Sequence, residues 1–329
     1  MEGEEDKGIV CVVGGTGYVA SWLIMRLLQS GYTVRTTLRS FPDSNRDISY
    51  LTNLPGAPEK LEIFAADLND PESFNGVVRG CTGVFLVAHP VSFEEKVPEE
   101  VTNQRAVKGT LGILQACLDS RTVKRVIYTS SAFTVMYNDK NSGIIDERNW
   151  TDVDFVRILK PFGESYIISK TLAERSALEF AEAHGLNLVS LIPPMIIGPF
   201  ICSRCPGSIY TVLGLIAGKE DQYKELPKTS MIHIDDVASA HIFLLEQANL
   251  NGRYICSPLE VTIYQISEFL STKYPEYPVP NSEFLKGIEE SKYPGLSSKK
   301  LLDTGFKFKY GFEEMFEGAI QCCKEKGFI

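Results

Sequence analysis

The sequence predicts an α/β fold, in which a doubly wound parallel sheet is followed by a smaller, mostly helical C-terminal lobe. Three observations support this. Short apolar runs alternate with longer amphipathic runs up to about Pro194, as in sheets whose strands are joined by crossover helices. A glycine-rich turn joins the first apolar run to the first amphipathic run. Beyond Pro194 the alternation loosens, and segments rich in proline and glycine separate short helical patterns.

The first strand is expected at Ile9–Val13, and the glycine-rich turn is Gly14–Ala20. Gly14 permits the tight turn, Gly17 lets the backbone approach a pyrophosphate, and Ala20 is small enough for the helix to pack on the strand. The free N–H groups of that helix's first turn would attract phosphates. The context predicts a Rossmann-type dinucleotide site, although a tight structural turn can also need glycine.

The other elements follow the same alternation. Strands are expected at Thr33–Leu38, Leu61–Ala65, Gly83–Ala88, Arg125–Thr129 and Asn187–Ile192. Helices are expected at Ala20–Ser30, Pro71–Arg79, Pro98–Leu118 and from Pro161 or Gly163 to Glu182, and the polar run Asn138–Asn149 is expected to be a loop. Strands at Met231–Ile234 and Gly252–Cys256 would flank a helix capped by Asp235 or Asp236.

These elements suggest the domain organisation. Residues 1–7 are acidic, lack the apolar core of a signal peptide, and are expected to be a flexible tail. Residues 8–195 would form the dinucleotide-binding domain, to which residues 231–256 return. Residues 196–230 and 257–329 would form the substrate-binding lobe.

Composition excludes several classes of protein. A net charge of −9 and a pI near 5.2 argue against binding to nucleic acid or anionic membranes. No apolar run reaches the ~18 residues that span a bilayer. Eight cysteines without a secretory signal suggest a cytoplasmic protein with reduced thiols. Cys202 and Cys205 have C-x-x-C spacing but no second pair or nearby histidine, so no metal site is expected.

The strand ends indicate which cofactor is bound. Arg39 ends the second strand, Arg46 follows seven residues later, and no acid lies between Thr33 and Ser40. A guanidinium pairs well with a 2′-phosphate, which favours NADP(H) over NAD(H). Alternatively, Arg39 is a solvated loop charge. After later strands, Asp67 would contact adenine or cap a turn, and His89 would line the cofactor site or act in catalysis.

Tyr166 and Lys170 lie one helical turn apart and therefore share a helix face. Of the fourteen tyrosines, Tyr166 alone has a lysine four residues later, and it follows Ser131 by 35 residues. A neighbouring ammonium and a positively charged nicotinamide ring would both favour the tyrosine's phenolate. Ser131, at the end of the fifth strand, would orient a carbonyl oxygen to which Tyr166 gives a proton.

These motifs together resemble the extended short-chain dehydrogenases/reductases, and the plant dihydroflavonol reductase-like branch over nearly the whole length. The stretches that carry the resemblance are Gly14–Ala20, Thr36–Arg39, Ala66–Leu68, Tyr128–Ala132, Tyr166–Glu174, Ile192–Phe200 and His233–Ala240. Tyr18–Leu28, Leu51–Leu61 and Ile320–Phe328 are similar to the vestitone reductase and noscapine synthase types within that branch. Members of the branch are often monomers, so a monomer is expected.

The resemblance implies roles for individual residues. Ser131, Tyr166 and Lys170 would be catalytic, and Lys170 would also hold the ribose hydroxyls. The cofactor would be bound by Gly14, Thr16, Gly17, Tyr18, Val19, Arg39, Arg46, Asp67, Leu68, Val87, Ala88, His89, Pro193 and Ser208. An apolar aromatic substrate would meet Phe133, Met136, Ile201, Ser230 and Met231, with core packing as the alternative for Phe133 and Met136.

Two departures from the family pattern narrow the substrate. Dihydroflavonol reductases carry an asparagine where this chain has Met136, and a thioether cannot make that residue's polar contacts with the substrate. Cinnamoyl-CoA reductases carry an Asn-Trp-Tyr-Cys-Tyr run near the catalytic tyrosine, and this chain has Pro161–Tyr166 instead. The expected activity is therefore NADPH-dependent reduction of a ketone on an isoflavonoid-, flavonoid- or alkaloid-like polycyclic compound.

Three alternatives remain at this point. The same residues would serve oxidation of a secondary alcohol or hemiacetal with NADP+ or NAD+, as in a noscapine synthase-like enzyme. A sugar epimerase would use the same fold, although the apolar pocket argues against it. A catalytically idle NADP(H)-binding regulator would need none of Ser131, Tyr166 and Lys170.

Overall fold

The computed structural model of the protein describes residues 7–39, 47–90, 97–139, 143–223, 226–288 and 295–329. Its main element is a seven-stranded parallel sheet in the order β3-β2-β1-β4-β5-β6-β9. The strands are β1 (Ile9–Val13), β2 (Thr33–Leu38), β3 (Leu61–Ala65), β4 (Gly83–Leu86), β5 (Arg125–Thr129), β6 (Leu188–Ile192) and β9 (Gly252–Ile255). The order reverses direction between β1 and β4, which confirms the predicted doubly wound α/β fold.

Helices cover both faces of this sheet. On one face α5 (Glu99–Ser120) and α8 (Glu164–His184) pack against each other, with η1 (Pro71–Phe74) and α4 (Asn75–Val78) beside them. On the other face lie α1 (Tyr18–Gln29) and α11 (Ile234–Glu246). In β1, Val10 and Val12 face the second group, whereas Cys11 and Val13 face the first, because successive strand side chains point to opposite faces.

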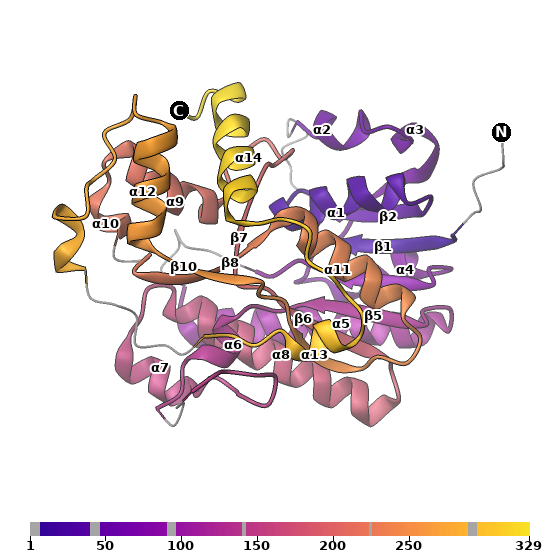
Figure 1. The fold of residues 1–329 in the computed structure, drawn as a ribbon. Helices are drawn as coiled ribbons and strands as arrows, with labels where there is room; N and C mark the ends of the chain where they lie inside the picture. The colour runs from indigo at the N-terminus through magenta and orange to yellow at the C-terminus, as the bar shows by residue number, and fades with distance from the viewer. Residues whose placement is uncertain (1–6, 40–46, 91–96, 140–142, 224–225, 289–294) are drawn as a thin grey trace.

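A second sheet forms the core of the C-terminal lobe, in the order β10-β8-β7. These strands are β7 (Met195–Ile197), β8 (Lys228–His233) and β10 (Leu259–Thr262), and β8 pairs parallel to β7 and antiparallel to β10. The lobe's helices are α9 (Gly207–Ala217), α10 (Glu220–Tyr223), α12 (Ile263–Lys273), η2 (Phe284–Gly287) and α14 (Phe312–Glu325). Figure 1 shows α9, α10 and α12 gathered on the side of the molecule away from α2 and α3.

The structure divides the C-terminal region differently from the sequence analysis. Of residues 231–256, α11 and β9 belong with the main sheet, but β8 pairs in the small sheet. Within 257–329, α13 (Lys299–Asp303) packs against β9 and places Leu301 in the core of the main sheet. The chain therefore passes between the two sheets several times.

Short elements were missed because their patterns are too brief to read. They are α2 (Ser49–Thr52), α3 (Ala57–Lys60), α6 (Phe133–Met136) and α7 (Val153–Leu159). The predicted cap of α11 was wrong: the ring of His233 accepts from the N–H of Asp235 at 3.1 Å, which leaves both aspartates free to bind elsewhere. Asp235 instead accepts from Trp22 and Arg26, and so ties α11 to α1.

All eight cysteines are free thiols in the structure. Within the described residues, no helix combines the length and apolarity needed to cross a bilayer. Nor do the described histidine, cysteine and acidic side chains form a group of three that could hold a metal ion.

Candidate active site at the carboxyl edge of the sheet

In the glycine turn after β1, the backbone is closely packed at Gly14 and Gly15 and accessible at Gly17. Gly14 has φ of 90°, and a Cβ there would lie 2.8 Å from the Cβ of Ala88. A Cβ on Gly15 would collide with the Thr36 side chain. A Cβ on Gly17 would have only the Gly14 carbonyl oxygen nearby, at 3.6 Å. Gly14 and Gly15 are thus required by packing, and Gly17 presents the exposed face of the turn.

Helix α1 begins directly after this turn, with Gly17 as its N-cap and no capping side chain. No acidic residue occupies its first turn. Its first N–H groups have no partner within the helix, and they carry the positive end of the helix dipole. The turn therefore fits the pyrophosphate of a dinucleotide, with Thr16, Gly17 and the backbone of Tyr18 and Val19 as the groups that would hold it.

Tyr18 also joins the two parts of the molecule. Its hydroxyl donates to the carbonyl oxygen of Gly198 at 3.0 Å, and its ring meets Phe200 edge-on at 6.4 Å. The residue that opens α1 is thereby fixed to the loop that follows β7.

The residues expected at the adenosine end lie at the ends of β2 and β3. Arg39 is exposed and makes no hydrogen bond or ion pair with the described part of the chain, so it can meet a phosphate. Arg46 lies outside the described residues. The Asp67 carboxylate accepts from the backbone and side chain of Asn69, at 2.8 and 3.0 Å, which is the turn-capping alternative. Leu68 packs against Gly109 of α5.

The remaining predicted cofactor residues line the same edge. Val87 and Ala88 follow β4, and the Ala88 N–H donates to Val13 at 3.0 Å. Pro193 follows β6, and its carbonyl accepts from Ala132 at 2.9 Å. Ser208, in the first turn of α9, donates to the Ile196 carbonyl at 2.6 Å. Strand ends β1, β4, β5 and β6 thus meet here, where ligands of such sheets bind.

Ser131 and Tyr166 are joined directly by a side-chain hydrogen bond. Ser131 follows β5, and Tyr166 lies in the first turn of α8. Burial raises the pKa of Tyr166, and the hydrogen bond with Ser131 only partly offsets that rise. The direction is opposite to the one expected from Lys170, because burial of the Tyr166 hydroxyl is the dominant effect.

Lys170 lies one turn further along α8 and is only 2% exposed. Its Nζ lies 4.9 Å from the centre of the Tyr128 ring. Burial lowers the pKa of Lys170 to about 7, with Glu174 acting in the opposite direction. Near neutral pH the lysine is therefore charged only part of the time, so its pull on the Tyr166 proton is weaker than that of a permanent cation.

Two aromatic rings enclose the Tyr166 side chain. The His89 ring lies edge-on to it at 5.5 Å, and Phe133 of α6 lies edge-on at 6.2 Å. His89 also shares a hydrogen bond with Ser169 at 3.0 Å, and burial, with a smaller effect of Lys170, holds the pKa of His89 well below its usual range. His89 is thus neutral and packed beside the catalytic candidates.

The predicted substrate residues fall into two groups. Phe133 and Met136 lie on α6, directly after Ser131, and pack with the small cluster around Val156 and Ile167. Ile201, Ser230 and Met231 come from the lobe: Ile201 and Ser230 are partly exposed, whereas Met231 is fully buried in the lobe's core. Of these five, Phe133 meets the Tyr166 ring edge-on. The substrate roles of all five stay predictions.

Comparison with known proteins places this edge in context. The model of the NAD dependent epimerase/dehydratase family matches residues 10–256, which include every element described around the site. The chain belongs to that family. It is an extended short-chain dehydrogenase/reductase, as its motifs suggested.

Individual relatives narrow the chemistry of this short-chain dehydrogenase/reductase. It is 51% identical to vestitone reductase of Medicago sativa, over 99% of each chain. It is 49% identical to noscapine synthase SDR1 of Papaver somniferum, over 98% of this chain and 94% of that one. The crystal structure of the alfalfa vestitone reductase has a TM-score of 0.88 over 98% of this chain and 100% of the other, at 50% identity. The protein is an oxidoreductase that acts on C=O or CH–OH groups.

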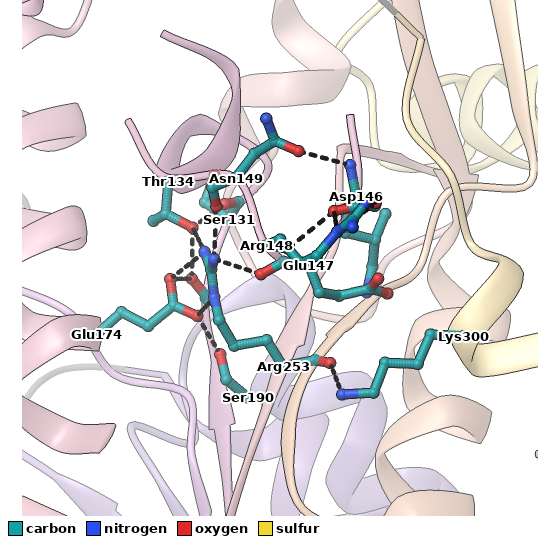
Figure 2. Close-up of polar contacts among 12 residues, drawn as sticks. Ser131, Thr134, Asp146, Glu147, Arg148, Asn149, Glu174, Ser190, Arg253 and Lys300 are labelled. Carbon is teal, nitrogen blue, oxygen red and sulfur yellow. Dashed lines mark hydrogen bonds and ion pairs between the residues drawn. The ribbon is translucent and has the colours of Figure 1, made fainter. Parts of the chain in front are cut away.

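One part of the reductase's site was missed by the sequence analysis. Glu174 is fully buried on α8, one turn beyond Lys170, and pairs with Arg253 of β9 at 3.0 Å. Figure 2 shows Glu174, Ser190, Thr134 and Arg253 drawn together by hydrogen bonds. The sequence did contain a signal for this pair. Arg253 lies in a strand that the sheet buries, and a buried cation needs an anionic partner.

Proposed function

We propose that the protein is an NADPH-dependent carbonyl reductase of plant specialised metabolism. It reduces a ketone on an isoflavonoid-, flavonoid- or alkaloid-like polycyclic compound, and Tyr166 donates the proton. The observation that carries this proposal is the hydrogen bond between Ser131 and Tyr166, at a sheet edge that also holds the glycine turn. We further propose that it acts as a cytoplasmic monomer.

The roles of the side chains follow from their chemistry. When bound, the nicotinamide supplies a hydride to the carbonyl carbon. Ser131 donates a hydrogen bond to the carbonyl oxygen, and Tyr166 gives that oxygen its proton. The raised pKa of Tyr166 keeps the phenol protonated at neutral pH, as a proton donor must be. Lys170, when charged, stabilises the phenolate that the transfer leaves.

The substrate class rests on the residues beside Tyr166 and on the relatives. Phe133 offers a ring, and Met136 offers an adaptable apolar side chain. Both suit a flat aromatic compound better than a sugar. The relatives include vestitone reductase and a dihydroflavonol 4-reductase of Zea mays that is 46% identical over 99% of this chain and 91% of that one.

Oxidation is the second candidate. The same three residues would run in reverse with NADP+ or NAD+, and the 49% identity to noscapine synthase SDR1 supports this direction. In this direction the tyrosine must accept a proton, so the rate would rise with pH.

The deciding experiment follows absorbance at 340 nm. NADPH oxidation is measured with vestitone, dihydroflavonols, flavanones, alkaloid ketones and phenolic aldehydes, beside NADP+ and NAD+ reduction with the corresponding alcohols. A clear preference for ketones supports the proposal, and activity confined to alcohols or hemiacetals replaces it with the NADP+- or NAD+-dependent dehydrogenase. No turnover on the whole panel, with NADPH binding confirmed by fluorescence, would favour a non-catalytic NADP(H)-binding protein.

Cofactor choice is tested by Arg39→Asp. We expect NADPH to bind about 10- to 100-fold more weakly, because a charged hydrogen bond of about 1.5–3 kcal/mol is lost. NADH binding should change little. Arg121→Asp is the matched control, since Arg121 is also exposed but follows α5 at the opposite edge of the sheet. Equal affinity of the wild-type protein for NADPH and NADH would contradict the role of Arg39.

A further inference from the structure

The carboxylate of Glu174 joins the elements that carry the three catalytic candidates. It comes from α8, the helix of Tyr166 and Lys170, and none of its surface is exposed. Its Oε2 accepts from the hydroxyl of Ser130 at 2.7 Å. Ser130 is the residue directly before Ser131. A single buried group thus links the helix of the proton donor to the strand end of its hydrogen-bond partner.

The partner of Glu174 extends this link to the substrate side. Arg253 donates to the Thr134 hydroxyl at 3.1 Å, and Thr134 lies on α6 between Phe133 and Met136. It also donates to the carbonyl oxygens of Glu147 and Asn149, at 3.0 and 2.6 Å. Figure 2 shows these bonds converging on the guanidinium.

Stability alone does not account for this arrangement. Taking a carboxylate and a guanidinium out of water costs several kcal/mol each, and well-packed apolar residues often replace such a pair without loss. The pair's directional bonds, by contrast, end on residues adjacent to Ser131 in the sequence and on α6. These hydrogen bonds fix the positions of Ser130 and α6 more closely than apolar packing would.

We propose that Glu174 is a positioning residue for ketone reduction, which fixes the strand end that carries Ser131 relative to Tyr166 and Lys170 on α8. The inference rests on the proposed roles of Ser131, Tyr166 and Lys170. Glu174 touches neither substrate nor cofactor, and it acts through Ser130 and through its charge.

The charge has a defined effect on Lys170. The groups that face Lys170 are Tyr166 and Glu174 of α8, His89 after β4 and Tyr128 of β5, with Arg253 of β9 behind the carboxylate. The carboxylate of Glu174 favours the ammonium form of Lys170, against the effect of burial. Without that negative charge, Lys170 gives up its proton at a lower pH. Reduction requires the protonated pair, so its rate should begin to fall at a lower pH too.

The structure provides a matched pair of variants. Ser130 and Ser190 are both buried, and each donates to the Glu174 carboxylate, at 2.7 and 2.6 Å. Ser130 adjoins Ser131, whereas Ser190 lies within β6 and is not next to a catalytic candidate in the sequence. Ser130→Ala and Ser190→Ala therefore each remove one hydrogen bond to Glu174. Only the bond of Ser130 connects Glu174 to the residue next to Ser131.

The experiment measures kcat, KM and the affinity for NADPH in both variants, with vestitone as the first ketone and otherwise the panel ketone that the wild-type enzyme reduces best. We expect Ser130→Ala to lower kcat about tenfold or more, because a small misplacement of catalytic groups is costly. The KM for the ketone and the affinity for NADPH should stay within about twofold. Ser190→Ala should keep kcat within about twofold. Equal kcat in the two variants would overturn the positioning role.

Glu174→Gln tests the charge, since glutamine keeps the shape. Its kcat should fall, and the decline of the reduction rate at high pH should move to lower pH. A wild-type kcat and pH profile would refute the inference. If this variant does not fold, Glu174→Gln combined with Arg253→Met removes both buried charges and is measured in its place. Should Tyr166→Phe retain turnover, the proposed role of Tyr166 as proton donor fails. If Tyr166→Phe abolishes turnover while Ser130→Ala and Ser190→Ala have equal kcat, only the role of Glu174 fails.

Discussion

Tyr166→Phe is expected to lower kcat by about 10²- to 10⁴-fold, the usual contribution of a positioned proton donor. Phenylalanine keeps the ring that packs against His89 and Phe133, and it removes only the hydroxyl bound to Ser131. The affinity for NADPH should therefore change less than about threefold. Stopped-flow or steady-state absorbance at 340 nm with the preferred ketone gives kcat, and fluorescence titration gives the cofactor affinity.

Tyr32→Phe is the control for this variant. Its hydroxyl also takes part in a side-chain hydrogen bond, to Glu246 at 3.0 Å, but Tyr32 directly precedes β2, at the opposite end of the strands from Ser131. Its kcat should match the wild type. Retained turnover in Tyr166→Phe would assign proton donation to another group, with His89 the nearest candidate.

Arg253→Met is expected to destabilise the protein by about 3–5 kcal/mol, because it leaves the Glu174 carboxylate buried without its cation. Burial raises the pKa of Glu174, and Arg253 together with the hydrogen bonds of Ser190 and Thr134 more than offsets this, so that the pKa is lowered in the wild type. The measurement is urea unfolding followed by circular dichroism. Arg157→Met is the matched control: its pairs with Glu99 and Asp154 are partly exposed, and losing them should cost less than about 1 kcal/mol.

The pH dependence separates a buried charge from lost packing. In Arg253→Met the pKa of Glu174 should rise above its unfolded value, so the carboxylate opposes folding increasingly as pH rises above that unfolded value. In the wild type, where the folded pKa is lowered, the pair's contribution is present above the unfolded pKa and lost as pH falls. The stability gap between variant and wild type should therefore narrow at low pH. A gap that is constant with pH would indicate lost packing alone.

Much of the main sheet could be predicted because its signals are local. Most of its strands are short runs rich in apolar residues. The turn after β1 needs glycine because a Cβ at Gly14 or Gly15 would meet Ala88 or Thr36. The catalytic candidates were also found locally, since Tyr166 and Lys170 share one turn of a helix. The environment of these residues could not be predicted in the same way. The pKa of Lys170 depends on how deeply the side chain is buried, which the spacing of residues in the sequence does not indicate.

The features that escaped prediction depend on contacts distant in sequence. Glu174 and Arg253 are 79 residues apart, and only the fold brings them together. The pairing of β8 with β7 and β10 likewise follows from the lobe's packing rather than from its own residues. At the start of α11, Asp235 suits an N-cap by residue type, but its carboxylate accepts from Trp22 and Arg26, and the ring of His233 caps the helix.

The repeated passage of the chain between the two sheets limits how this enzyme can be recombined. β7 and β8, then β10 and α12, and finally α14 build the lobe from three separate stretches, with α11, β9 and α13 returning to the main sheet between them. A chimera made at a single breakpoint would join lobe segments from two parents within one core. Grafting a relative's specificity onto this chain therefore requires the three stretches to be exchanged together.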